Sequence, residues 1–224
     1  MKIILNTIMT TLALGILSLL NSCGGYRVRT KGNPFAEHGI KSVAIPMFVN
    51  ESVYPKANVP FTREIKTLLA GYPGLEISTS PNAEVDALLI GIVESDNRYT
   101  EAYKTTATNF QSGSTIGNRA GLYVPTASQF KIQVRVMLIK DPTIEDQKLF
   151  KSKWGEYMDR HPKVVFNRSF SYTGSFNRDA RPTDTSDSGG IVNYTNTRRY
   201  FDQTLQSLAE SNARDFEELV INVF

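Results

Sequence analysis

The sequence is poor in the residues that build disulfides, zinc sites and histidine-dependent catalysis. It contains one cysteine and two histidines among 224 residues. A single cysteine excludes an internal disulfide framework and any multi-cysteine metal site. His38 and His161 have no catalytic partner nearby in the sequence, so we interpret both as solvated side chains.

An excess of charge of one sign is also lacking. The chain has 25 Lys and Arg against 22 Asp and Glu, dispersed along its length, and a formal net charge of +3. Nucleic-acid binding requires a concentrated basic stripe. The sequence contains no G-x-S-x-G elbow, P-loop, H-E-x-x-H helix or G-x-G-x-x-G loop. We therefore predict a protein that is not an enzyme, binds no nucleic acid and needs no metal or cofactor.

The N-terminus has the pattern of a secretion signal. Lys2 is followed by an apolar run to Leu20 that is too short and too polar for a typical membrane span. The sequence from Leu20 to Cys23 resembles the lipobox of bacterial lipoproteins, although Asn21 departs from it. The resemblance implies that Cys23 becomes the acylated N-terminus, with diacylglycerol on its thiol. An ordinary signal peptide with a free thiol is the alternative. Gly24 is not the aspartate that retains many lipoproteins at the inner membrane.

The chain divides into three predicted parts: a signal peptide over 1–22, an acylated tether over 23–38 and a single domain over 39–224. The elements expected in the domain are strands near 40–48, 75–77, 87–93, 130–138, 149–157 and 164–172, a helix capped by Asn58, and a helix from about 197. This order predicts an α+β fold with two helices packed on one face of a single mixed four- or five-stranded sheet.

Alternation within the strand near 130–138 predicts that the sheet has one wet face. The residues expected on this face are Lys131, Gln133, Arg135 and Met137.

Two long polar segments, 104–126 and 174–196, are expected to be loops. Structureless loops of this length are uncommon unless they are functional or disordered, and both possibilities stay open here. The first contains Lys104 and Arg119 as its only charged residues. The second contains Arg178 and Arg181 against three aspartates.

Four segments together resemble the lipopolysaccharide-assembly lipoprotein family LptE. They are Cys23–Arg27, Ile40–Ser52, Phe61–Ile65 and Ala83–Val93, and the similarity continues through Phe130–Leu138. The family shows Cys-Gly-Tyr, a strand ending in apolar-Pro-x-Phe-x-Asn, a helix and Ala-Asp-x-x-Leu-x-Gly-x-Ile. This chain departs from the pattern by an extra glycine after the cysteine, by Val85 before Asp86 and by the long segment 104–126.

The resemblance implies an outer-membrane lipoprotein, anchored on the periplasmic side of a Gram-negative-type envelope. Its partners would be the LptD-like β-barrel translocon, in which it sits as a plug, and lipopolysaccharide, which the translocon delivers to the outer leaflet. Because lipopolysaccharide is anionic, charge alone makes Lys104 and Arg119 the first candidates for ligand contacts, followed by Arg178 and Arg181.

Two other functions stay open from the sequence. One is a periplasm-facing lipoprotein adaptor or activator of a peptidoglycan synthase or another envelope machine. The other is a lipid-binding lipoprotein that acts alone. The identity of the partner discriminates between the plug and the adaptor, since a large β-barrel would support the plug and a penicillin-binding protein would support the adaptor.

Overall fold

The computed structural model describes residues 32–80, 84–95, 102–116, 119–143, 162–180 and 193–222. The chain separates into two units, residues 1–32 and 33–224, and all the elements described below belong to the second. The predicted signal peptide, Cys23, Arg181 and the predicted strand at 149–157 lie outside the described residues.

Seven strands form one sheet. They are β1 (Ser42–Ala44), β2 (Val49–Glu51), β3 (Glu76–Ser78), β4 (Ala87–Glu94), β5 (Lys104–Ile116), β6 (Arg119–Lys140) and β7 (Val164–Asn177). The path through the sheet is β3-β1-β4-β6-β5, with β2 beside β4 and β7 beside β6. Pairs among β1 to β4 are parallel, and every pair that includes β6 is antiparallel.

Strand β6 organises the sheet because three strands pair with it. β4 pairs with residues 133–140 of β6, β5 pairs with residues 119–129, and β7 pairs with residues 127–139. Some residues of β6 that pair with β7 also pair with β4, and others also pair with β5. Strand β7 therefore occupies one edge of β6, while β4 and β5 follow each other along the opposite edge. The remaining elements are a short 3-10 helix η2 (Ala36–His38), helices α2 (Asn58–Ala70) and α6 (Tyr194–Phe216), and a π-helical turn η4 (Glu217–Ile221).

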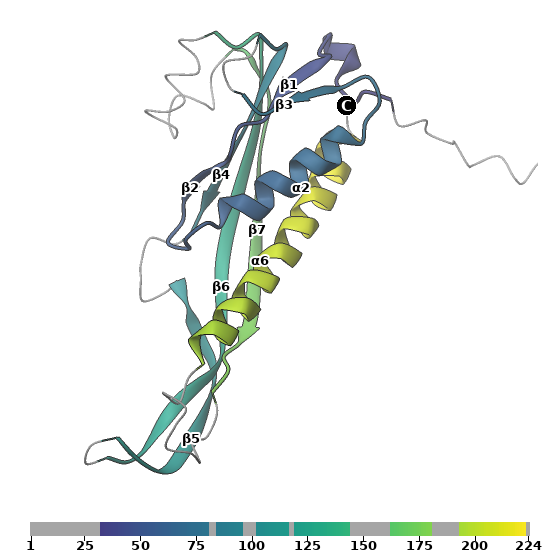
Figure 1. The fold of residues 1–224 in the computed structure, drawn as a ribbon. Helices are drawn as coiled ribbons and strands as arrows, with labels where there is room; N and C mark the ends of the chain where they lie inside the picture. The colour runs from purple at the N-terminus through teal and green to yellow at the C-terminus, as the bar shows by residue number, and fades with distance from the viewer. Residues whose placement is uncertain are drawn as a thin grey trace, which may run out of the picture. The chain divides into compact units, whose positions relative to one another are not determined.

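Helices α2 and α6 lie side by side on one face of the sheet (Figure 1). Phe61 and Ile65 of α2 and Phe201 and Leu205 of α6 belong to the same buried core. The sheet contributes inward-facing residues of β6 to this core: Phe130, Ile132, Val134, Val136 and Leu138. The predicted α+β architecture, with two helices on one face of a mixed sheet, is confirmed.

The opposite face of the sheet is only partly wet. A second buried cluster lies there, formed by Ala44, Leu88, Ile90, Ile92, Met137 and Ile139. Strand β4 is therefore buried on both faces, as its continuous apolar run predicts. Met137 is fully buried, so its predicted place on a wet face was wrong. The polar part of this face begins at Arg135 and continues toward Lys131.

The largest correction concerns residues 104–126, which are not a loop. They form β5 and the first part of β6, joined as a hairpin with β-bulges near Ala107 and Thr108. The segment is rich in Thr and contains Phe110, Tyr123 and Val124, residue types that favour strands. Sequence periodicity missed these strands because seven consecutive residues of β5, 104–110, are exposed, so no apolar alternation marks a buried face.

Smaller corrections concern the ends of elements. Within the predicted strand near 40–48 only β1 forms, and the short strand β2 follows beyond its end; the two pair successively with the same edge of β4. Asn58 does not cap α2, because its side chain donates to the Phe48 carbonyl at 2.6 Å. Helix α6 begins at Tyr194 rather than near 197, capped by Asn193, whose Oδ1 accepts from the Asn196 amide at 3.0 Å. Residues 174–177 belong to β7 rather than to a loop.

Candidate functional site

A row of four polar residues crosses the face of the sheet opposite the helices. Glu51 of β2 pairs with Glu94 of β4, Glu94 pairs with Gln133 of β6, and Gln133 pairs with Ser171 of β7. Cross-strand partners place their side chains on the same face. Gln133 lies between the inward-facing Ile132 and Val134, so the whole row faces away from α2 and α6.

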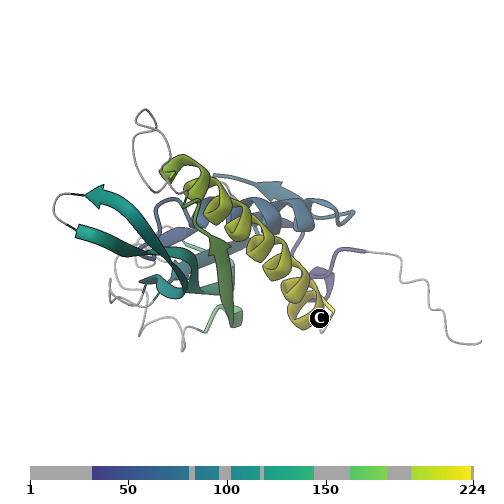
Figure 2. The same cartoon turned by 90° about the horizontal axis from the view of Figure 1, so that it is seen from below.

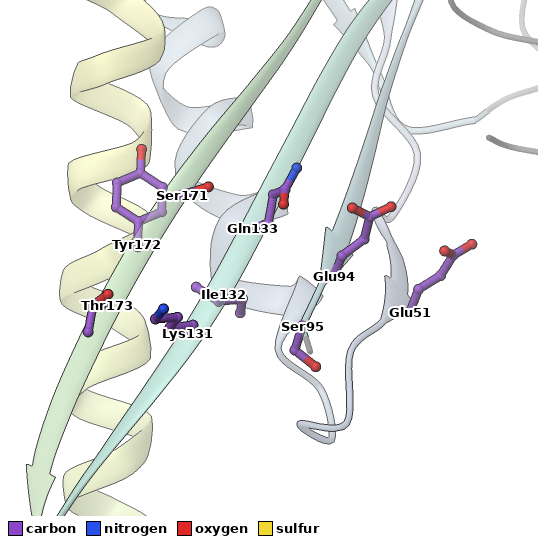
Figure 3. Close-up of a pocket in the computed structure, with 9 residues that line it drawn as sticks. All are labelled: Glu51, Glu94, Ser95, Lys131, Ile132, Gln133, Ser171, Tyr172 and Thr173. Carbon is purple, nitrogen blue, oxygen red and sulfur yellow. The ribbon is translucent and has the colours of Figure 1, made fainter. Parts of the chain in front are cut away.

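The next row contains Lys131 of β6 opposite Thr173 of β7. Together with Ser95, these two rows line a hollow of about 530 Å³, which also contacts Ile132 and Tyr172 (Figure 3). It lies along β6 between residue 133, where β4 ends its pairing, and residue 129, where β5 begins. We call this surface the polar sheet face and define it by Glu51, Glu94, Lys131, Gln133, Ser171 and Thr173.

The polar sheet face can bind polar partners of either charge. Two carboxylates lie on directly paired residues, and one ammonium group lies a row away, among hydroxyl and amide groups that both donate and accept hydrogen bonds. The lining residues include no histidine or cysteine, so the described pocket offers no imidazole base or thiolate nucleophile.

Arg135 marks the boundary between the polar and the apolar rows. It pairs with Ile92 on one side and Ser169 on the other. Its Nε atom is buried and has no hydrogen-bond partner in the part of the chain that the structure describes. Two positive charges thus lie near the hollow, one on the exposed Lys131 and one on the half-buried Arg135.

Two tyrosines behind the sheet are held in the protonated state. The Tyr172 hydroxyl donates to Asp215 Oδ2 at 2.8 Å and accepts from Asn212 Nδ2 at 3.2 Å, and burial is the main cause that raises its pKa above 10. Burial and the bond to Glu217 Oε1 at 2.9 Å raise the pKa of Tyr72 to about 12. At neutral pH both phenols donate hydrogen bonds to α6 or η4, and neither can act as a base.

The four basic residues predicted to contact a ligand are not gathered into one site. Lys104 pairs with Gln129, which is next to the inward-facing Phe130 in the strand and so faces the other way, and Lys104 therefore lies on the side away from the helices. Arg178 Nε instead donates to the buried Ser128 Oγ at 2.8 Å, on the helix side. These two side chains therefore lie on opposite faces of the sheet.

Arg119 is distant from Lys104 along the hairpin. Arg119 pairs with Ile116 at the turn, whereas Lys104 pairs with Gln129 at the base. Ten residues of strand separate positions 119 and 129, roughly 30 Å at the rise of a β-strand. Arg181 lies outside the described residues. Ligand binding by any of the four stays a prediction, but the three described positions cannot grip the same small anionic group.

Comparison with known proteins finds distant structural likeness and no sequence family. No family model and no curated protein matches the chain. A Caulobacter crescentus protein assigned as a lipoprotein is similar with 9% identity and a TM-score of 0.40, covering 85% of this chain and 96% of its own. PelC from Paraburkholderia phytofirmans, a dodecamer, is similar with 17% identity and a TM-score of 0.35, over 79% and 85% of the two chains.

Rare lipoprotein B from Shewanella oneidensis is similar with 8% identity and a TM-score of 0.37, over 81% of this chain and 95% of its own. The chain is thus distantly similar in structure to bacterial envelope lipoproteins. Within the described ranges, no helix is long and apolar enough to cross a membrane. In the same ranges, no three His, Cys, Asp or Glu side chains are placed to hold a metal ion.

Proposed function

We propose that this chain is a non-catalytic outer-membrane lipoprotein that sits as a plug in an LptD-like β-barrel and assists lipopolysaccharide insertion. The motifs that resemble the LptE family support the partner, and the lipobox-like Leu20–Cys23 supports the anchor. In this proposal Cys23 carries the acyl chains, and the domain lies on the periplasmic side of the outer membrane.

The polar sheet face is the observation that carries the proposal. Strands of a membrane barrel turn apolar side chains outward and polar side chains toward the lumen. A plug must therefore present a hydrated surface with donors and acceptors of both charges, which the rows at Glu94–Gln133 and Lys131–Thr173 provide. The helices bury the other face of the sheet, so the polar sheet face is available for the barrel wall.

A charge exchange on the polar sheet face tests this proposal. The double variant Lys131→Glu with Thr173→Arg introduces an opposite-charge pair across β6 and β7, moves the positive charge from β6 to β7 and brings an arginine into the hollow. The matched control is Arg199→Glu with Gln203→Arg, which makes the same charge changes at exposed positions four residues apart on α6.

The measurement is affinity capture from solubilised outer membranes, with the captured proteins identified by mass spectrometry. We expect the wild type and the control to recover an LptD-like barrel, and the Lys131/Thr173 variant to recover roughly tenfold less. Equal recovery by all three proteins would place the contact elsewhere on the molecule. Recovery of a penicillin-binding protein in place of a barrel would overturn the proposal in favour of an adaptor for peptidoglycan synthesis.

A further inference from the structure

The hairpin of β5 and β6 extends beyond the rest of the sheet. The last residue pair between β7 and β6 is Asn177 with Ala127, so residues 119–126 of β6 pair only with β5 among the described strands. Figures 1 and 2 both show this two-stranded segment reaching past the N-terminal end of α6. We call residues 104–116 and 119–126 the β5–β6 ribbon.

An aromatic pair is exposed in the middle of the ribbon. Phe110 and Tyr123 are cross-strand partners with ring centroids 5.2 Å apart, yet they remain 52% and 71% exposed. Their contact supports the hairpin itself. This contact leaves most of both rings exposed to water, which favours a second contact with a molecule outside the domain.

The ribbon is complementary to a negatively charged surface. Its sequence contains Lys104 and Arg119 and no Asp or Glu. The two cationic positions lie near opposite ends of the ribbon, with the aromatic pair between them. Thr105, Thr106, Thr108 and Asn109 are exposed along β5 and supply hydroxyl and amide donors for phosphate oxygens.

We propose that the β5–β6 ribbon lies in the headgroup layer of an anionic lipid bilayer. Tyrosine and other amphipathic aromatics concentrate at membrane interfaces, where the ring meets acyl chains and the hydroxyl stays hydrated. Lys and Arg strengthen attachment to anionic lipids. Among the ribbon residues whose side chains the structure describes, the exposed large apolar groups are one pair of rings, which is small beside a stable protein interface that buries on the order of 800 Å² on each partner.

Backbone geometry limits the depth of this contact. Among the described residues, no strand pairs with the second edge of β5, so its free amide and carbonyl groups must stay hydrated. The headgroup layer provides water and phosphate for these groups, whereas the hydrocarbon core does not. The ribbon therefore lies along the surface, with both cationic positions near lipid phosphates.

Hydrogen exchange of the full-length protein tests this proposal. The protein is incubated at low ionic strength with excess vesicles of phosphatidylglycerol, or of phosphatidylcholine as the neutral lipid, and exchange of the ribbon amides is measured. Each cation near an anionic surface strengthens attachment about fivefold. With two cations we therefore expect the ribbon to exchange about 25-fold more slowly on anionic than on neutral vesicles, with the difference reduced by added salt.

Two variants separate the charge from the aromatic contribution. Lys104→Gln with Arg119→Gln keeps the aromatic pair and should abolish the difference between the two lipids. Phe110→Ser with Tyr123→Ser should reduce protection on both lipids. The control, Arg199→Gln with Arg214→Gln on exposed positions of α6, removes the same charge and should behave as wild type.

Equal ribbon exchange on the two lipids with the wild-type protein would overturn the proposal. Protection that arises only when a purified outer-membrane barrel is added would also overturn it, and would assign the ribbon to a protein partner. The first result leaves the proposed plug function to its own test, because the vesicles contain no barrel. The second overturns the lipid contact alone and is compatible with the plug function.

Discussion

At the scale of single residues, Asp86 holds the beginnings of two strands together. Its Oδ2 accepts from the amides of Lys41 and Ser42 at 2.8 and 2.9 Å and from the Ser42 hydroxyl at 3.0 Å. Hydrogen bonds from these groups, the Lys41 amide first, lower the pKa of the Asp86 carboxyl below its ordinary value of 3.8. The ionised carboxylate is therefore the form that stabilises the junction of β1 and β4.

We expect Asp86→Asn to destabilise the domain by about 1 kcal/mol at pH 7. This value is small for hydrogen bonds to a charged group, because the carboxylate is partly exposed. A carboxyl with a lowered native pKa stabilises the fold above its unfolded pKa, and this stabilisation disappears as the pH falls through the native pKa. Urea unfolding at pH 7 and at pH 3 measures both effects. The loss caused by Asp86→Asn should shrink at pH 3, while the exposed control Glu84→Gln should show no such loss at pH 7. A loss of the same size at both pH values would refute the ionic explanation.

Gly91 is required by a close approach inside the sheet. A Cβ atom at this position would overlap the buried ring of Phe48. We expect Gly91→Ala to cost about 1–3 kcal/mol or more, because overpacking forces the ring out of its place. Thermal unfolding measures the cost. Phe48→Leu removes the ring, so in a chain that carries both changes Gly91→Ala should cost less stability than it does alone. Strict additivity of the two losses of stability would contradict the overlap.

At the scale of elements, α6 and η4 are held to the sheet by a buried stripe that continues to Phe216 and Val220 but leaves Leu219 outside it. Leu205 is buried, Leu208 is half-buried against the core, and Leu219 is 60% exposed on η4. We expect Leu205→Ala to cost about 2–5 kcal/mol, which lowers the melting temperature by roughly 5–15 °C. Leu208→Ala should have a smaller effect of the same sign. Leu219→Ala is the control and should change stability by less than about 0.5 kcal/mol. Equal shifts for Leu205 and Leu219 would be incompatible with this packing.

Elements with a buried face could be predicted from the sequence, and those without one could not. The helix period placed α2 and α6, and the apolar run placed β4, because each buries residues at regular intervals. Residues 104–110 of the β5–β6 ribbon are all exposed, so its threonines and asparagines have the composition of a loop. Asn58 is a good capping residue by type, but a tertiary bond to Phe48 engages its side chain instead.

At the scale of the whole molecule, the proposed membrane anchor is Cys23, which lies outside the described residues. We expect Cys23→Ala to accumulate as uncleaved precursor or as a soluble form, since one position supplies both the processing site and the acyl chains. Membrane fractionation with mass analysis of the N-terminus measures this. Normal processing of Cys23→Ala, with continued partition into detergent-extracted membranes, would show that the anchor lies elsewhere.

The candidate site was less predictable than the fold because it depends on register. Lys131, Gln133 and Arg135 were expected on a wet strand face from alternation within one strand. Glu51, Glu94 and Ser171 join Gln133 only through pairing between strands that are distant in the sequence. Alternation within a strand predicts a face, but no local pattern predicts which residue lies opposite on the next strand.

The long strand β6 has a consequence for the order of folding. Among the described strands encoded before it, β1, β2 and β3 pair only within the group β1 to β4, in parallel and through short registers. Strand β4 needs residues 133–140 of β6 to complete its second edge, and β5 pairs with β6 alone. Non-local pairing of this kind delays folding, because loop closure is unfavourable until the partner arrives. A chain synthesised N-terminus first should therefore stay open until β6 has emerged. During that interval β4, with its apolar residues on both faces, is the segment most exposed to aggregation.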